Sequence, residues 1–345
     1  MGLNFLMKIL HICNLAYKKS AEQFYNTDRK ISFGLQQNGH FVYDFSFKDM
    51  AYFGTIWRTK KIGAKWANAE VLRLTDNLQP DLVLIGHCPQ IDPETLKQIR
   101  QKYPNIKIAF WYVDPIYESE KIKFIHKFQP YLDTIFTTTG GELLQQFAKD
   151  HTTAAYMPNM VNPAVEIGQS FKAEQLDFDF VFCGSAGDQE RVKFVEQLKQ
   201  KIAFAKLYLP GFVAPKVYGA KYIRTLMCSR MGLSYSRNNQ ISLYVSDRIA
   251  QLTGHGLLTF TPVVPDLKLL FSEQEVVYFN DLDDLADKVE YFKQHPEQAQ
   301  QIAEAGWKRA HSSYHCQRVT KFMLETIFDK PYSENYEWLE HVFKK

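Results

Sequence analysis

The chain has 345 residues, which is longer than one ordinary domain and suits two. Hydrophobic residues make up 46% and charged residues 23%, a balance that excludes a largely disordered chain. The formal charge of +3 is mild and argues against a nucleic-acid binder, which usually carries a concentrated basic stripe.

Strand-like and helix-like runs alternate through the first third of the chain. The predicted strands are Lys8 to Ile12, Phe41 to Phe45, Leu82 to Ile85 and Lys107 to Tyr112. The predicted helices are Arg29 to Asn38, Ala64 to Asn77 and Pro93 to Lys102. Asp28, Arg29 and Lys30 either form a solvated helix start, which we favour, or reach a cleft between the domains. Nearly continuous apolar strands separated by helices are typical of a parallel sheet covered on both faces.

The segment from Met157 to Gln169 breaks this rhythm. It holds two prolines, two asparagines and a glycine, a composition that indicates a linker between domains. The alternation then restarts, with predicted strands at Phe178 to Cys183, Lys206 to Leu209, Gly232 to Ser236, Leu257 to Thr261 and Glu275 to Phe279. The predicted helices are Gln189 to Ala203, Tyr218 to Ser229, Asp247 to Thr253, the region from Asp281 onward and, after the break at Pro331, Glu334 to Phe343.

Five cysteines without a CxxC pair indicate free thiols in a reducing compartment, so we expect a cytoplasmic protein. The sequence contains no run of 18 apolar residues, so it predicts no membrane-spanning segment. The stretch from Trp57 to Trp66 is basic and amphiphilic. It is consistent with a peripheral contact at the inner face of a membrane, and a solvated surface loop explains it equally well.

The segment from Ser246 to Phe260, with the sequence SDRIAQLTGHGLLTF, carries the most information about family. Three further motifs follow it in order: Asp281 to Leu285, His295 to Gly306 and Tyr314 to Arg318. From Phe178 to Phe328 the chain resembles the C-terminal donor domain of GT-B glycosyltransferases, and within them the CgeB-like group of family-1-type enzymes. In the first half, Asn38 to His40 and Trp111 to Pro115 resemble the same group more weakly.

The resemblance implies an α/β protein with two tandem Rossmann-like, doubly wound domains in the GT-B architecture, facing a central cleft. Residues 1–165 would form the acceptor-side domain, residues 166–328 the donor domain, and residues 329–345 a helical tail packing back on the first domain. The implied reaction moves a sugar from a nucleotide-sugar donor to a hydroxyl acceptor. The acceptor would be a cell-surface glycan, a lipopolysaccharide, another lipid-linked group or a protein.

The predicted donor site begins at a helix start. Ser246 is expected to cap the helix that Asp247 and Arg248 open, whose N–H groups suit a diphosphate. Arg248 can add a bidentate phosphate contact, although a surface arginine on a capped helix explains the same residues. Gly184 and Ser185 follow the first strand of the second domain, where small residues let a ligand approach the backbone closely, as an ordinary tight turn also would.

Four further side chains complete the predicted donor site. Arg191 lies one turn into the next helix, and Tyr235, Arg237 and Asn238 follow a strand, where they can contact base, ribose or phosphate or form a solvated loop. Many GT-B enzymes use a glutamate of the donor helix to bind ribose hydroxyls, and Gln251 occupies the matching position here. An amide still bonds a hydroxyl, but the donor preference can change.

Two residues of the first domain are candidates for the base that takes the proton of the acceptor hydroxyl. Asp114 follows the strand ending in Tyr112, and His87 follows the strand ending in Ile85. A turn-forming aspartate before Pro115 and a satisfied histidine near the core are the structural alternatives. Asp177 and Asp179 resemble a metal-binding DxD pair, but they precede a strand and belong to a different transferase architecture.

No metal and no cofactor is expected, because GT-B enzymes generally work without a bound metal. Two other functions stay open at this point. One is a non-catalytic nucleotide or sugar binder on the same scaffold, which Gln251 favours. The other is a sugar-nucleotide epimerase, for which the sequence shows no convincing acid and base pair.

Overall fold

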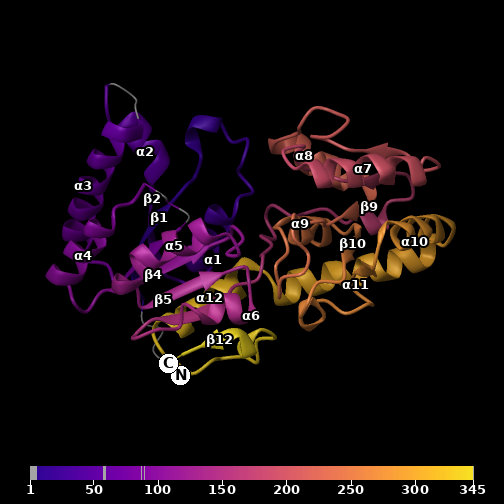
Figure 1. The fold of residues 1–345 in the computed structure, drawn as a ribbon. Helices are drawn as coiled ribbons and strands as arrows, with labels where there is room; N and C mark the ends of the chain where they lie inside the picture. Colours follow the sequence, from indigo (N-terminus) through magenta and orange to yellow (C-terminus); the bar gives the residue numbers. More distant parts are fainter. Residues whose placement is uncertain (1–5, 57–59, 87, 89, 345) are drawn as a thin grey trace. The chain divides into compact units, whose positions relative to one another are not determined.

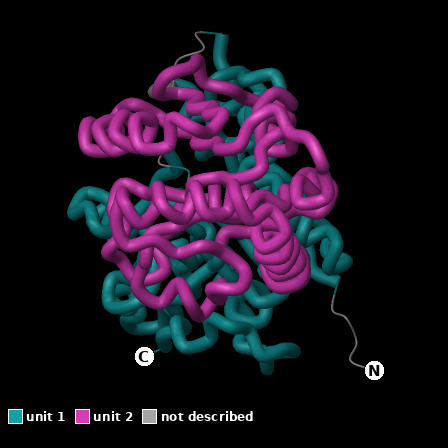
Figure 2. The backbone as a smooth tube through the Cα atoms, turned by 90° about the vertical axis from the view of Figure 1, so that its right-hand side faces the viewer, with its two compact units in different colours: residues 1–158, 316–345 teal, residues 159–315 magenta. Residues whose placement is uncertain are grey.

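A computed structural model describes residues 6–344 apart from 57–59, 87 and 89. The chain divides into two compact units (Figure 2). Unit 1 comprises residues 1–158 and 316–345, and unit 2 comprises residues 159–315. Among the described residues, every helix is too short or too polar to span a lipid bilayer.

In its described residues, unit 1 contains a seven-stranded sheet of order β12-β6-β5-β4-β3-β1-β2 (Figure 1). The strands are β1 (Lys8–Cys13), β2 (Phe41–Ser46), β3 (Leu82–Ile85), β4 (Lys107–Tyr112), β5 (Thr134–Thr137), β6 (Thr153–Tyr156) and β12 (Val342–Phe343). All pairs are parallel except β12 with β6. The buried strand β3 and β4, which is buried after Lys107, lie at the centre, as is typical of a parallel sheet covered by helices on both faces.

The helices of unit 1 begin and end at recognisable signals. They are α1 (Thr27–Gln37), α2 (Phe47–Phe53), α3 (Lys60–Leu78), α4 (Pro93–Lys102), α5 (Ser119–Phe128), α6 (Gly141–Gln145) and α12 (Cys316–Ile327). The side chain of Asn26 caps α1, and that of Asp92 caps α4 immediately before Pro93. Both caps satisfy N–H groups that the helix cannot pair internally.

Unit 2 contains a parallel sheet, five-stranded over its described residues, of order β11-β10-β9-β7-β8. Its strands are β7 (Phe178–Val181), β8 (Leu207–Tyr208), β9 (Ser229–Leu233), β10 (Leu258–Pro262) and β11 (Val277–Phe279). Its helices are α7 (Gln189–Lys201), α8 (Gly219–Met227), α9 (Arg248–Gly254), α10 (Leu282–Gln294) and α11 (Pro296–Ser313).

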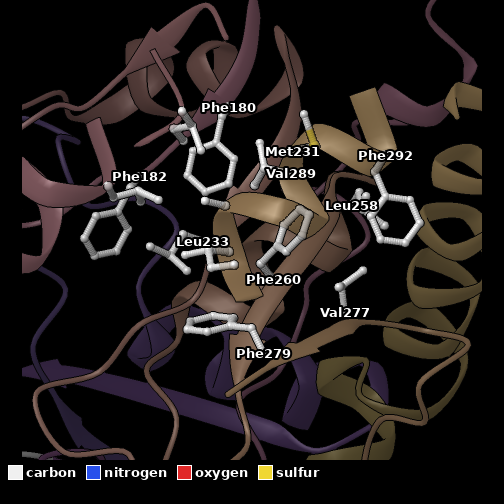
Figure 3. Close-up of a cluster of buried hydrophobic side chains, with 14 of the residues drawn as sticks. Phe180, Phe182, Met231, Leu233, Leu258, Phe260, Val277, Phe279, Val289 and Phe292 are labelled. Carbon is white, nitrogen blue, oxygen red and sulfur yellow. The ribbon is translucent and has the colours of Figure 1, made fainter. Parts of the chain in front are cut away.

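One face of this sheet carries a core rich in aromatic residues (Figure 3). Phe180 and Phe182 lie two residues apart and therefore share a face, on which Phe260 and Phe279 also lie. Residues of α7 and α10 cover them, among them Val289. The aromatic residues of these runs thus act in core packing, as the strand pattern predicts.

The domain boundaries differ from the predicted ones, because the chain crosses between units twice. The first unit ends at Pro158 and not at 165, and residues 316–327, predicted to belong to the donor domain, form α12 of unit 1. Gly34 of α1 explains the second crossing. A Cβ at Gly34 would lie 2.3 Å from the carbonyl oxygen of Cys316, so the two helices pack with backbone almost in contact.

The tail also differs from the sequence prediction. Residues 334–343 do not form a helix. Leu339–His341 form one 3-10 turn and Val342–Phe343 add the antiparallel strand β12 to β6. Tyr336 and Trp338 are buried against Phe322 of α12, so tertiary packing overrides the helical pattern of the segment.

We expect Gly34→Ala to destabilise the protein by about 1–3 kcal/mol, because the added methyl group forces α1 and α12 apart. Alanine favours helix formation, so any loss must come from the contact. Gly187→Ala is the control, since its Cβ would meet only the hydroxyl of Ser185, at 3.8 Å. Urea denaturation measures both variants, and equal stability of the two would contradict this description of the interface.

Candidate functional site

The unit 2 sheet has a switch point between β7 and β9. The chain runs from β7 to the edge strand β8 and returns to β9 on the other side of β7. Loops that leave neighbouring parallel strands in opposite directions open a crevice at their carboxyl ends, which is where ligands bind in such sheets. The predicted segments Gly184–Ser185 and Tyr235–Asn238 follow these two strands. The structure therefore brings both to the same edge.

Arg248 joins these segments. Its guanidinium donates to the carbonyl oxygen of Cys183 at 2.9 Å and to that of Tyr235 at 3.2 Å. It also donates to the hydroxyl of Ser246 at 3.0 Å and lies over the ring of Phe182, 4.8 Å from its centroid. Arg248 is thus a structural tie between three chain segments, and its removal would disturb the loops as well as any ligand. Burial lowers the pKa of the group.

Arg191 adds a second buried guanidinium. Only 9% of the residue is exposed, and it donates to the carbonyl oxygen of Ser185 at 2.8 Å. Its Nε is buried, with no hydrogen-bond partner among the described residues. Burial lowers the pKa of Arg191, and the charges of Arg248 and Arg237 lower it further, while Asp188 opposes the shift. The charges of Arg248 and Arg237 therefore both act on Arg191, and an anion bound beside Arg191 would offset their effect.

The loop after β7 is open to an incoming ligand. Nothing but the Ser185 hydroxyl lies within 4 Å of a Cβ at Gly187, and Lys216 donates to that hydroxyl at 3.1 Å. Gly184 has no such freedom, since a Cβ there would lie 2.6 Å from the ring of Phe212. No local sequence motif marks Lys216, because it lies in a loop 31 residues from Ser185.

The loop after β9 is built by its own side chains. The Asn239 carboxamide accepts from the N–H of Ser236 at 3.1 Å, and that of Asn238 accepts from the N–H of Gln240 at 2.9 Å. The ring of Tyr235 stacks on Phe194 with centroids 4.2 Å apart. Arg237 is exposed, and no hydrogen bond or ion pair of its guanidinium is found within the described part of the chain. Tyr235 and Asn238 thus shape the loop, and Arg237 is available to a ligand.

The start of α9 differs from the predicted cap. The helix begins at Arg248 with Asp247 at the N-cap position, and no side chain caps it. The Ser246 hydroxyl accepts from Arg248 instead, and the backbone N–H of Ser246 donates to the Ser236 hydroxyl at 3.2 Å. Because α9 has only seven residues, its macrodipole is small. The positive charge at this edge therefore comes from the arginines.

Gln251 is engaged at both ends of its amide. It donates to the carboxylate of Asp247 at 2.5 Å and accepts from the hydroxyl of Tyr222 on α8. Only 7% of the residue is exposed. The network holds Asp247 beside Arg248, so Gln251 has a positioning role in this structure, and its amide would have to leave a partner to bond a ribose.

The two predicted base candidates lie in unit 1. Asp114 follows β4, is partly exposed and forms an ion pair with Lys121 at 3.4 Å. His87 lies outside the described residues. Asp28 and Lys30 were expected on a solvated helix start, and this was wrong, because both are buried.

Two groups of potential metal ligands have other roles. His11, Cys13 and Asp44 are close together, but Nε2 of His11 accepts from Trp111 at 3.3 Å, so the ring proton is on Nδ1, which faces Ser32 and Asp44. This donor arrangement does not fit a bound cation. Asp179, from the predicted non-functional DxD pair, forms an ion pair with Lys293 at 2.7 Å. It lies in β7, before the strand's carboxyl end.

Residues 174–325 match the family model described as Glycosyl transferase-like. This segment is thus similar to the glycosyl transferase-like family. No curated protein matches the sequence significantly. The match covers the switch-point loops of unit 2 together with Arg191, Arg237 and Arg248.

Solved structures of low sequence identity share the fold. A UDP-forming trehalose-phosphate synthase from Burkholderia xenovorans aligns with a TM-score of 0.60 at 10% identity, over 94% of this chain and 99% of that one. Anabaena HepE in complex with UDP aligns with 0.53 at 11%, over 94% and 100%. A protein described as a UDP-N-acetylglucosamine 2-epimerase from Listeria monocytogenes aligns with 0.56 at 10%, over 94% and 97%. The predicted GT-B architecture and the resemblance to GT-B glycosyltransferases are confirmed, while the CgeB-like subgroup stays a prediction.

We expect Gln251→Glu, which restores the glutamate common in GT-B enzymes, to lower stability near neutral pH by about 1–3 kcal/mol. The new carboxylate would face Asp247, so its pKa in the folded protein would be raised. A raised pKa means that the stability is retained below the unfolded pKa of glutamate and lost as pH rises through the folded pKa.

Thermal unfolding of Gln251→Glu from pH 4 to pH 8 measures this loss. Gln197→Glu, at an exposed position of α7, is the control for the added charge. A pH profile of Gln251→Glu that follows the control would show that Gln251 and Asp247 are not coupled.

Proposed function

We propose that the protein transfers a sugar from a nucleoside diphosphate sugar to a hydroxyl group of an acceptor. The observation that carries this proposal is the cluster of Arg191, Arg237 and Arg248 at the switch point of a glycosyl transferase-like domain. A diphosphate carries the charge that would relieve their mutual repulsion. The complex of Anabaena HepE with UDP supports a nucleotide ligand for this fold.

The arginines would act on the leaving group. When the bond between the anomeric carbon and the diphosphate breaks, negative charge grows on the departing phosphate oxygen. Arg191 is already positioned by Ser185, and Arg248 by Cys183 and Tyr235, so neither has to reorganise as that charge develops. Lys216 and Arg237 supply exposed cations that can close on the phosphates. We propose that these side chains provide the charge that other transferases obtain from a metal ion.

The remaining predicted donor residues take supporting roles in this proposal. Ser185 and Gly187 give the phosphates access to the backbone after β7, while Gly184 lets the ring of Phe212 pack against the start of this loop. Tyr235 and Asn238 set the shape of the loop that carries Arg237, and Ser246, Asp247 and Gln251 hold Arg248 in place.

The acceptor would approach from unit 1, and for it we retain the prediction of a glycan, a lipid-linked sugar or a protein. Asp114 stays the sequence-based prediction for its base, together with His87. No disulfide joins the five cysteines in the described part of the chain, which supports the proposed cytoplasmic location. Ile56 and Ile62 are exposed beside the basic start of α3, in line with the predicted peripheral membrane contact.

An epimerase is the second candidate, because a protein described as a UDP-N-acetylglucosamine 2-epimerase shares the fold. An epimerase needs acid and base groups beside the donor sugar. Near the arginines, the carboxylates of Asp188 and Asp247 are engaged, the first with the N–H of Arg191 and the second with Gln251. This arrangement favours transfer over epimerisation.

Incubation with UDP-glucose, UDP-N-acetylglucosamine, UDP-galactose and GDP-mannose tests the proposal. We expect one of them to raise the melting temperature and to release its nucleoside diphosphate slowly by hydrolysis. Stabilisation without release would indicate a binding protein, and conversion of the sugar without release would indicate an epimerase. The absence of stabilisation by all four nucleotide sugars and by UDP and GDP would contradict the proposal.

We expect Arg237→Ala to raise the Kd for the nucleoside diphosphate about tenfold, because one charge-assisted contact is lost. The melting temperature should not fall, because no structural contact of this guanidinium is found among the described residues and a like charge near Arg191 is removed. Lys199→Ala removes the same charge from an exposed position of α7 and should bind normally. Calorimetric titration with UDP and GDP measures both, and equal Kd values would remove Arg237 from the site.

A further inference from the structure

Unit 1 has its own switch point, between β1 and β3. The chain runs from β1 to the edge strand β2 and returns to β3 on the other side of β1. The carboxyl ends of these strands lead into Asn14 and Gly86. A side chain from another element, Asp28 of α1, reaches this point. Since ligands of doubly wound sheets bind at switch points, Asp28 lies where a substrate of unit 1 would be expected.

The Asp28 carboxylate is nearly buried and only half engaged. Nine per cent of the residue is exposed, and Oδ1 accepts from the N–H of Asn14 at 2.7 Å. No hydrogen bond to Oδ2 is found among the described residues. A Cβ at position 86 would lie 2.6 Å from the ring of Trp111 and 3.2 Å from Oδ1, so the glycine there lets this ring and the carboxylate approach the end of β3 closely. Asp28 thus keeps one oxygen that can accept a further proton.

The loop that follows β1 is rigidly built around this group. Asn26 donates to the carbonyl oxygen of Asn14 at 2.8 Å, and Arg29 donates to that of Leu15 at 3.3 Å. Ala16, Ser20 and Ala21 have positive φ angles of 54°, 48° and 67°. Three non-glycine residues in this strained region within six positions indicate a loop held in place by its surroundings, as is common at functional sites.

Titratable groups of several elements surround Asp28. His11 and Cys13 belong to β1, Lys48 to α2, and Cys88 follows β3. Burial raises the pKa of Asp28, while the nearby His11, the Asn14 N–H and the charge of Lys48 oppose the shift. A carboxylate with a raised pKa takes a proton more readily than an ordinary one, which suits a general base.

We propose that Asp28 is the catalytic base that takes the proton of the acceptor hydroxyl. The acceptor oxygen bonds to the anomeric carbon of the donor sugar. The bond from that carbon to the diphosphate oxygen breaks, and its electron pair leaves with the nucleotide. The acceptor proton passes to Oδ2 of Asp28. This inference rests on the proposed sugar transfer, and it assigns the base to a residue other than Asp114.

Variants of two other aspartates in unit 1 distinguish a catalytic role of Asp28 from a structural one. Asp49 is as buried as Asp28 and also binds the loop after β1, through the N–H groups of Tyr17 and Lys18. Its Oδ2 additionally accepts from the Ser46 hydroxyl. Asp114 is partly exposed and ion-paired with Lys121. Asp49→Asn therefore controls for loop disorder, and Asp114→Asn tests the rival base.

The experiment measures hydrolysis of the nucleotide sugar that the wild-type protein cleaves fastest, with water as the acceptor, from pH 4.5 to pH 9. We expect Asp28→Asn to lower kcat at least about 100-fold, the usual contribution of a general base. The acid limb of kcat/KM should disappear, because the wild-type rate rises as Asp28 loses its proton. The Kd for UDP or GDP should stay within twofold. Asp49→Asn should lower the melting temperature and keep the acid limb.

Carbon-13 NMR of the aspartate carboxyl groups in the wild-type protein provides a readout independent of variant folding. The titration midpoint of the Asp28 resonance should lie above the range of ordinary aspartates. It should coincide with the midpoint of the acid limb of kcat/KM. A kcat of Asp28→Asn within threefold of wild type, an acid limb lost only in Asp114→Asn, or an Asp28 resonance that titrates elsewhere would overturn the assignment. Failure of the wild-type protein to bind or cleave any nucleotide sugar would instead overturn the proposed function, and this inference with it.

Discussion

The guanidinium of Arg248 connects the chain segments that follow β7 and β9 with the segment that precedes α9. Two of its partners are main-chain carbonyl oxygens, so the bonds do not depend on which side chains those loops carry. The ring of Phe182 lies beneath the guanidinium and links it to the aromatic core of unit 2. The aromatic core beneath the sheet therefore helps to fix the position of the loops at its carboxyl edge.

A tie of this kind has an electrostatic consequence. Arg248 carries its charge into a partly buried place where Arg191 is already held by Ser185. The proximity of Arg237 adds a third charge to the group. Like charges at short range raise the free energy of the folded protein. A bound anion lowers it again, which strengthens anion binding. The cluster is therefore better explained as a binding device than as a contribution to stability.

The sequence predicted this region well where local pattern decides the structure. Alternating apolar strands and helices gave the parallel architecture, and the small residues after Phe182 marked the turn at the switch point. Prediction failed where distant side chains decide. The partner of Gln251 is Tyr222, 29 residues away, and the contact of Gly34 with Cys316 that assigns α12 to unit 1 spans most of the chain. The strands β5 and β6 are short and rich in threonine and alanine, so no apolar run reveals them.

Asp28 shows the same limit for function. Beside Arg29 and Lys30, its sequence context indicates a solvated helix start, and only the return of the chain from β2 to β3 places the carboxylate at a switch point. Topology, which no local window contains, here decides between a surface residue and a candidate catalytic one.

Hydrogen–deuterium exchange with saturating UDP, and separately with GDP, tests the central claim most directly. The account predicts that one of these nucleotides slows amide exchange in unit 2 at residues 184–191, 235–239 and 246–251, which carry the three arginines and the loops that Arg248 joins. Unchanged exchange in these segments with both nucleotides, or protection confined to unit 1, would contradict it.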